Sequence, residues 1–315
     1  MDQLIGGGSI GFITHHSFML HNMGDYHPEC PERLHAINDR LISAGVEPYL
    51  YHREAHKVER EQLLRVHDSD YIDQVFETSP ADGFAYLDGD TAMCPDTLDA
   101  ALFAAGANVQ AVDMVMTGQV KKTFCAVRPP GHHAEHNRAM GFCFFNNVAV
   151  AAAHAIEAYG LERVAIVDFD VHHGNGTEDI FSGNSKVLFC SSFQHPFYPG
   201  SGADTSVDNI VNCPLPAGAG SREFRDAVST AFVPAIEAFK PQLILISAGF
   251  DAHISDDMAQ MELHESDYAW VTQQLCSLAD TYCEGKVVST LEGGYSLDAL
   301  ARCVTVHVKR LMGQV

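Results

Sequence analysis

The stretch RVAIVDFDVHHGNG, residues 163–176, carries the pattern that decides the fold. It opens as a continuous run of apolar residues, which is typical of a strand that is buried on both faces of a sheet. It then places Asp168, Asp170, His172 and His173 within six positions and ends in glycines. Because buried carboxylates need partners, this cluster of acids and imidazoles at a strand end indicates a functional site.

Further segments repeat the apolar pattern of this strand and alternate with longer helical patterns. Such alternation predicts an α/β protein with a mainly parallel sheet flanked by helices. The chain has 315 residues, 46% of them hydrophobic, and no repeat or Pro/Ser-rich linker, so we expect a single domain over 1–315. The other expected strands are 10–16, 122–130, 186–193, 242–251 and 286–295, and the expected helices are 97–116, 144–159, 222–239, 266–283 and 297–312.

The composition argues against several classes of protein. A formal net charge of −22 makes nucleic acid an unsuitable ligand, because phosphate binding needs clustered Lys and Arg. The acidic surface either attracts cationic substrates or serves solubility alone. No apolar run reaches the roughly 18 residues of a membrane helix. Nine scattered cysteines without a CxxC pair favour free thiols, and MDQLIGGGSIGFITHH lacks the features of a signal peptide, so we expect a cytoplasmic protein.

Polar side chains follow four of the expected strands. In open α/β sheets, ligands bind beyond the carboxyl ends of the strands. The motif RPPGHHAEH follows one strand, Asp170 and His172 follow the second, Asp251 follows the third, and EGGY follows the fourth. Four such clusters in the same position predict one shared site.

Asp170 and His172 have the spacing of a metal site. Residues i and i+2 of an extended chain point to the same side, so one carboxylate and one imidazole can bind one ion. Mixed N/O ligation suits Zn²⁺, with Fe²⁺ and Co²⁺ as alternatives. A catalytic zinc site has three protein ligands and one open position, and Asp251 is the best third candidate. Taken singly, Asp170 could cap a helix or form an Asx-turn, and His172 could be a hydrogen-bonded core histidine.

The tandem His132 and His133 are candidates for proton transfer, or one of them is a further metal ligand. Asp168 faces the same way as Asp170 and could orient an imidazole, or its role is structural. Tyr295 closes LEGGY, where its phenol could donate a hydrogen bond to a developing oxyanion or simply pack after a turn.

Four motifs in this chain resemble those of zinc-dependent histone deacetylases, and the likeness runs from about His15 to about Val308. The sequence is most similar to the class II branch and to bacterial deacetylase-like amidohydrolases, which implies the arginase–deacetylase fold. HPECPERL, residues 27–34, resembles the first active-site loop of the family. The four motifs are RPPGHHAEHNRAMGFCFFNNVAVAA, VAIVDFDVHHGNGTEDIF, LILISAGFDAH and LEGGYS.

The resemblance implies a role for each residue of the site. His133 would act as general base and acid, His132 as its electrostatic partner and Asp168 as the acceptor for His132. Tyr295 would stabilise the oxyanion. The implied zinc ligands are Asp170, His172 and Asp251.

The resemblance also implies a substrate tunnel and one or two potassium ions. Its tunnel residues would be Gly141, Phe142 and Tyr198. The inner potassium site would involve Asp168, Asp170, His172, Ser191 and Ser192, and the outer site would use backbone carbonyls of Phe181, Asn184 and Val187.

Four positions bear on the reaction and its substrate. Asn175 stands where class I members have an aspartate, which should lower the pKa of His133 because no anion favours the imidazolium. Met258 stands where polyamine-specific relatives have a glutamate, which favours acyl-lysine over acetylpolyamine. Gly174 cannot supply the extra ligand of the two-manganese arginases, although His253 could complicate the count of metals.

The resulting hypothesis is a zinc-dependent amidohydrolase that removes an acetyl or other short acyl group from an N-acylated amine. The favoured substrate is Nε-acetyl-lysine in a peptide or protein, and the alternative is an acetylpolyamine or another acetylated small amine. An inactive acyl-lysine binder and a binuclear ureohydrolase are further alternatives. A homo-oligomer is possible, because many relatives associate.

Overall fold

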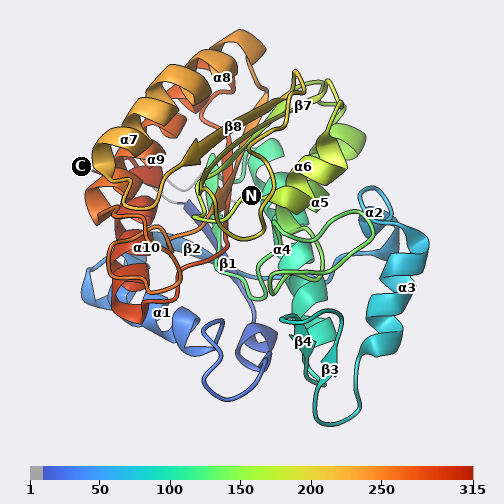
Figure 1. Ribbon diagram of the computed structural model, residues 1–315. Coiled ribbons are helices and arrows are strands. Elements are labelled where there is room, and N and C mark those ends of the chain that lie inside the picture. The colour runs from blue at the N-terminus through green and yellow to red at the C-terminus, as the bar shows by residue number, and fades with distance from the viewer. Residues whose placement is uncertain (1–9, 315) are drawn as a thin grey trace.

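The computed structural model describes residues 10–314 and contains an eight-stranded, entirely parallel sheet (Figure 1). This confirms the predicted fold class. The first nine residues, on which part of the signal-peptide prediction depends, lie outside the described residues. The strands of the sheet are β1 (Ile10–Thr14), β2 (Leu50–Glu54), β5 (Lys122–Cys125), β6 (Val164–Asp168), β7 (Val187–Gln194), β8 (Ile210–Leu215), β9 (Leu243–Ala248) and β10 (Val287–Leu291).

The order of the strands across the sheet is β2-β1-β5-β10-β9-β6-β7-β8. After β5 the chain passes over two positions to form β6, and β9 and β10 later fill that gap. The four strands that are followed by polar clusters, β5, β10, β9 and β6, are therefore neighbours. Their side chains are almost fully buried, as expected for a parallel sheet covered on both faces.

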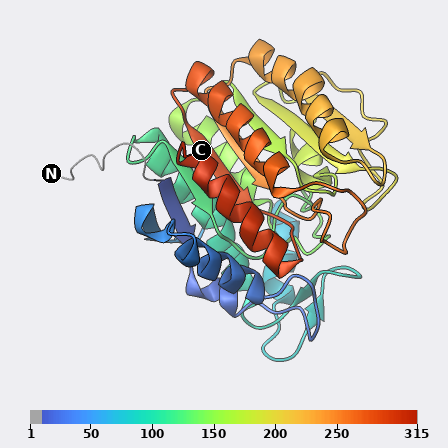
Figure 2. The same ribbon diagram turned by 90° about the vertical axis from the view of Figure 1, so that its left-hand side faces the viewer.

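Helices cover both faces of the sheet. Figure 2 looks onto α1, α10 and α9, which lie side by side across one face. On the other face α4 contacts α5 and β5, and α5 contacts β6 and β9. The helices are α1 (Glu32–Ser43), α2 (Arg60–Leu63), α3 (Ser69–Thr78), α4 (Thr97–Met116), α5 (Asn147–Tyr159), α6 (Asn175–Phe181), α7 (Ser221–Ala227), α8 (Val233–Phe239), α9 (Glu265–Tyr282) and α10 (Leu297–Leu311).

Several boundaries differ from the sequence-based expectation. The helix expected from 144 begins at Asn147, because the Asn146 side chain accepts from the backbone N–H of Ala149 at 3.0 Å and caps it. The helix expected over 222–239 is interrupted by a π-helical turn, Val228–Phe232, next to Pro234, which lacks an N–H. HPECPERL, residues 27–34, resembles an active-site loop of the family, but its last three residues are helical, because α1 begins at Glu32.

The remaining elements are short. A hairpin of β3 (Ala85–Tyr86) and β4 (Ala92–Met93) stands apart from the main sheet. Two 3₁₀ turns, η1 (His16–Met19) and η2 (Glu47–Tyr49), precede α1 and β2. All nine cysteines are free thiols, as predicted. Within residues 10–314, no helix has the length and apolar character needed to cross a membrane.

Candidate active site

Asp170, His172 and Asp251 come together at the carboxyl edge of the sheet. Asp170 and His172 follow β6, and Asp251 follows the neighbouring β9. One ligand atom from each lies within 4.8 Å of those of the others. His172 Nδ1 is 3.0 Å from Asp170 Oδ1 and 3.3 Å from Asp251 Oδ2. All three side chains are buried. Asp170 caps no helix, since α6 begins at Asn175, but its Oδ1 does accept from the backbone N–H of His172 at 2.9 Å, as in an Asx-turn. His172 is not an isolated core histidine, because both carboxylates lie beside its Nδ1.

The acid-rich triad has the electrostatics of a cation site. Burial and the nearby Asp170 together raise the pKa of Asp251 to about 7. Burial opposes a charge on His172, yet Asp170 and Asp251 outweigh it and raise the pKa of His172 to about 10. Within the described chain, Asp251 Oδ2 is buried and accepts no hydrogen bond of good geometry, although His172 Nδ1 lies 3.3 Å away. A divalent cation would satisfy this oxygen and neutralise both carboxylates.

Backbone groups and two glycines fix the position of the carboxylates. Val171 N–H donates to Asp251 Oδ1 at 2.9 Å, and Gly293 N–H donates to Asp170 Oδ2 at 2.8 Å. A Cβ at Gly293 would overlap with both carboxylates, and a Cβ at Gly249 would overlap with Asp170. These positions need glycine because the carboxylates lie directly against the backbone.

His132 lies between two acids behind the triad. Its Nδ1 is 2.8 Å from Asp168 Oδ2, and its Nε2 is 3.8 Å from Asp170 Oδ2. Burial would lower the pKa of His132, but the coulombic attraction of Asp168 and Asp170 raises it well above its ordinary value. A positively charged His132 is therefore favoured at neutral pH.

His133 has the opposite electrostatics. Its ring centroid is 4.0 Å from that of His132, and burial together with the charges of His132 and His172 holds the pKa of His133 well below its ordinary value. His133 Nδ1 is 2.7 Å from Asn175 Oδ1, while Asn175 Nδ2 donates to Glu135 Oε1 at 2.8 Å. The amide therefore presents its oxygen to His133, which places the ring proton on Nδ1 and leaves the Nε2 lone pair free.

Glu292 supports the loop that carries the two histidines, and sequence reasoning missed it. Glu292 Oε2 accepts from the backbone N–H groups of Gly131 and His132 at 2.7 and 3.2 Å, and Oε1 accepts from Ser247 Oγ at 2.9 Å. Burial raises the pKa of this carboxyl to about 7. Its position in EGGY, directly after a buried strand, was the available signal.

A cavity of about 200 Å³ leads to this group of side chains. The predicted tunnel residues Gly141, Phe142 and Tyr198 all line it, and so does Met258, the position expected to bear on the choice of substrate. His133, His172 and Tyr295 line it as well. Asp90 and Phe197 line it too and were not predicted. The Phe197 ring stacks on the His172 ring at 5.5 Å, and its position next to Tyr198 was the only signal for it.

Tyr295 lies half-buried at the wall of this cavity. Arg33 lies over its ring at 5.0 Å, and Phe142 packs edge-on at 6.1 Å. Burial, opposed by Arg33 but reinforced by Asp251, raises the pKa of Tyr295 well above its ordinary value. The phenol therefore stays protonated and can donate a hydrogen bond.

The residues of the two predicted potassium sites differ in their surroundings. Ser191 pairs with Asp168 across β7 and β6, and its buried Oγ has no hydrogen-bond partner among residues 10–314, so the inner group fits a cation. Ser192 follows it on the same strand. The carbonyls of Phe181, Asn184 and Val187 also converge, but they converge on the side-chain amide of Asn209.

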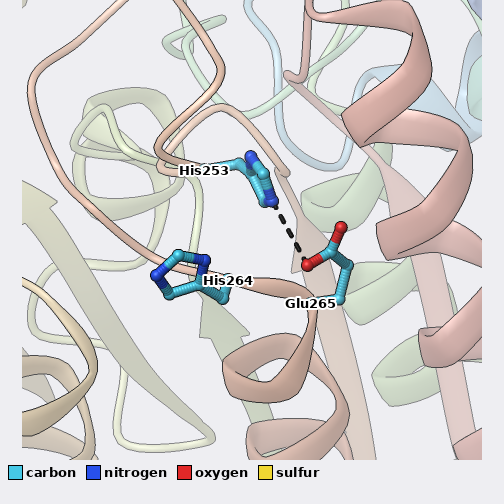
Figure 3. A group of neighbouring side chains, drawn as sticks. All are labelled: His253, His264 and Glu265. Carbon is cyan, nitrogen blue, oxygen red and sulfur yellow. Dashed lines mark ion pairs between the residues drawn. The ribbon is translucent and has the colours of Figure 1, made fainter.

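His253 does not join the triad. Its ring points at Glu265, beside His264 (Figure 3), with Nε2 3.5 Å from Glu265 Oε2. Ser255 N–H donates to His253 Nδ1 at 3.0 Å, so the proton of the neutral ring sits on Nε2. A protonated nitrogen has no lone pair for a metal, and Arg302 already binds the other Glu265 oxygen. Glu265 is therefore paired with Arg302, and the neutral His253 ring lies beside that ion pair.

Comparisons with known proteins agree with this geometry. A family model described as the histone deacetylase domain matches residues 27–311. The histone deacetylase-like amidohydrolase of Pseudomonas aeruginosa is 36% identical over 91% of this chain and 77% of its own length. The polyamine deacetylase HDAC10 of Mus musculus is 40% identical over 90% of this chain and 45% of its own length. A crystal structure of the HDA15 HD domain has a TM-score of 0.91 and 36% identity, covering 98% of this chain and 89% of that chain.

The parallel sheet, the polar cluster at its carboxyl edge and these relatives define a hydrolase of the deacetylase and amidohydrolase class. The chain belongs to the histone deacetylase domain family and has its arginase–deacetylase fold.

Proposed function

We propose that the protein is a zinc-dependent deacetylase whose substrate is Nε-acetyl-lysine in a peptide or protein. The observation that carries the proposal is the composition of the cavity wall. A single aromatic cavity reaches His172 of the acidic triad, the neutral imidazole of His133 and the phenol of Tyr295. A base, an oxyanion donor and a metal site at the end of one narrow cavity are the parts that metal-assisted amide hydrolysis needs.

Asp170, His172 and Asp251 are the residues that we assign to the zinc ion. Two carboxylates and one imidazole form a donor set suited to Zn²⁺, and three protein ligands leave a position for a water or substrate. The ion would lower the pKa of a water molecule and polarise the acyl carbonyl. The buried Asp251 Oδ2, which accepts no hydrogen bond of good geometry within the described chain, supports this assignment.

His133 is the residue that we assign to proton transfer. Because Asn175 holds the ring proton on Nδ1, Nε2 can accept a proton as water attacks the acyl carbonyl. The same nitrogen then donates a proton to the leaving amine. Burial and the charge of His132 keep His133 neutral beforehand, since a cation whose ring centroid is 4.0 Å away disfavours a second one.

Tyr295 is the residue that we assign to the oxyanion. A protonated phenol at the cavity wall can donate a hydrogen bond to the carbonyl oxygen as negative charge develops there. Arg33 and Phe142 hold its ring from two sides, so this donor is positioned before the substrate arrives.

The cavity wall supports a long, neutral acyl-lysine side chain. Phe142, Phe197 and Tyr198 supply aromatic surfaces, and Met258 supplies an apolar one. Asp90 is the one acid among the lining residues outside the triad. It favours a second candidate, an acetylated polyamine, because its carboxylate could attract an ammonium group, and one relative is named a polyamine deacetylase.

We also assign one potassium ion to the group around Asp168, Ser191 and Ser192. The unpartnered Ser191 Oγ supports this site, and the ion would hold the end of β6, two residues before Asp170, in a fixed position.

The test compares kcat/KM of the zinc-loaded protein on an acetyl-lysine peptide and on N-acetylspermidine. The proposal expects hydrolysis of the peptide, loss of activity on chelation and recovery with Zn²⁺. A higher kcat/KM on acetylspermidine would favour the polyamine alternative. Full activity in protein shown to be free of metal would refute the zinc-dependent mechanism.

A further inference from the structure

The backbone carbonyls of Phe181, Asn184 and Val187 surround a single point between α6 and β7. Phe181 is the last residue of α6, and Val187 is the first residue of β7. Carbonyl oxygens at a helix end carry partial negative charge and need a donor or a cation. A ring of such oxygens is also the arrangement that binds potassium in proteins.

The side-chain nitrogen of Asn209 occupies that point. Asn209 directly precedes β8, and its Nδ2 donates to the carbonyls of Phe181, Asn184 and Val187 at 2.8, 3.2 and 2.9 Å. An amide nitrogen carries two hydrogens, so three acceptors share them. The oxygens are therefore satisfied by the chain itself.

The orientation of this amide is fixed by a fourth contact. Gly183 N–H donates to Asn209 Oδ1 at 2.9 Å. In a flipped amide the NH₂ group would face Gly183 N–H, which is also a donor. Asn209 Oδ1 would then face the three carbonyl oxygens with no hydrogen between them. The nitrogen therefore has to face the carbonyls.

We propose that Asn209 takes the place of the second potassium ion that the family resemblance implies, so that the protein binds potassium at the inner site alone. A cation and Asn209 Nδ2 cannot occupy the same point. Binding of an ion there would require the side chain to leave, which would break its bonds to three carbonyls and to Gly183. The connection between α6, β7 and β8 is held by an amide instead of an ion. This inference does not depend on the substrate.

The proposal makes the cation requirement depend on one side chain. The substitution Asn209→Asp has nearly the same shape but places a carboxylate oxygen among three carbonyls. Four oxygens then repel one another unless a cation lies between them. Asn38→Asp, on α1, introduces the same charge away from this cluster and serves as the matched control.

Crystals soaked in thallium(I), an ion that replaces potassium and scatters anomalously, give the most direct test. In the unaltered protein we expect no thallium peak among Phe181, Asn184 and Val187, and in Asn209→Asp we expect one. A peak at this point in the unaltered protein would overturn the proposal, and it would do so even if the variant failed to fold.

Thermal unfolding in potassium chloride and in tetramethylammonium chloride provides the second readout. The inner potassium site is present in every variant and contributes equally to each Tm. The test therefore compares the rise in Tm that potassium causes in one variant with the rise that it causes in another. We expect potassium to raise the Tm of Asn209→Asp by about 3 °C or more beyond its effect on the unaltered protein and on Asn38→Asp. An equal potassium effect in all three folded proteins would overturn the proposal.

Discussion

Substitution of Gly293 by alanine should disable the proposed metal site while leaving every assigned ligand in place. Gly293 follows β10, and its N–H donates to Asp170 Oδ2, a bond that alanine can also make. Its φ is not positive, so alanine meets no backbone strain. The effect of Gly293→Ala is therefore steric and acts on the two carboxylates.

The size of the effect follows from the space around Gly293. An alanine Cβ would lie 2.6 Å from Asp170 Oδ2 and closer still to Asp251 Oδ2. Ordinary contact needs about 3.5 Å, so at least one carboxylate has to withdraw by about 1 Å. Metal sites tolerate ligand displacements of about 0.2 Å, and a misplacement of about 1 Å lowers turnover roughly 100-fold.

The assay measures zinc per chain after dialysis against a zinc buffer, together with kcat/KM on the acetyl-lysine peptide. Gly293→Ala should lose bound zinc and at least about 100-fold in kcat/KM. Gly220→Ala is the matched control, because its Cβ would lie 3.6 Å from its nearest neighbour, Glu262 O. A folded Gly293→Ala protein with full zinc and unchanged kcat/KM would refute this account of the carboxylates.

Three further predictions concern catalysis, specificity and stability. Tyr295→Phe should lower kcat about 10²- to 10³-fold with unchanged zinc content, because it removes the oxyanion donor; unchanged kcat would show that another group stabilises the oxyanion. Met258→Glu should raise kcat/KM for N-acetylspermidine relative to the acetyl-lysine peptide by about tenfold, or about 1.4 kcal/mol; no change in this ratio would remove Met258 from the specificity argument. Burial lowers the pKa of His67 to about 4, and its nitrogens are held neutral by bonds to Glu135 O and Asn146 N. In the unfolded chain His67 binds a proton as the pH falls through 6.5, whereas in the folded chain it stays neutral down to about pH 4. The free energy of unfolding should therefore fall by about 2 kcal/mol between pH 6.5 and 5 because of His67. Urea denaturation should show a smaller loss in His67→Gln, and equal losses would contradict the assignment.

The central strands could be predicted from the sequence because both of their faces are buried. Strand β6 opens with four apolar residues, Val164–Val167, and all five of its residues are buried, which is the pattern expected of a strand covered on both faces. The edge strands were not predicted. Strand β2 has exposed charged residues at Arg53 and Glu54, and β8 contains Pro214, both of which are features that edge strands tolerate and that hide the strand pattern.

The site could be predicted in part, through the rule that polar residues gather at carboxyl ends of parallel strands. The rule selected the right strand ends, but the sequence does not show that β9 and β10 insert between β5 and β6, which is what brings Asp251 to Asp170. The roles of Glu292 and Asn209 depend on contacts with residues far along the chain. The position of Glu292 directly after a buried strand was a signal for it, whereas no local pattern reports the contacts of Asn209, which emerge from the structure alone.

The central claim is that Asp170, His172 and Asp251 hold one catalytic divalent ion. Diffraction from zinc-loaded crystals, recorded on both sides of the zinc absorption edge, tests it most directly. The account predicts one anomalous peak per chain, within bonding distance of all three side chains. A peak elsewhere, or none in crystals of protein that is active without metal, would contradict it.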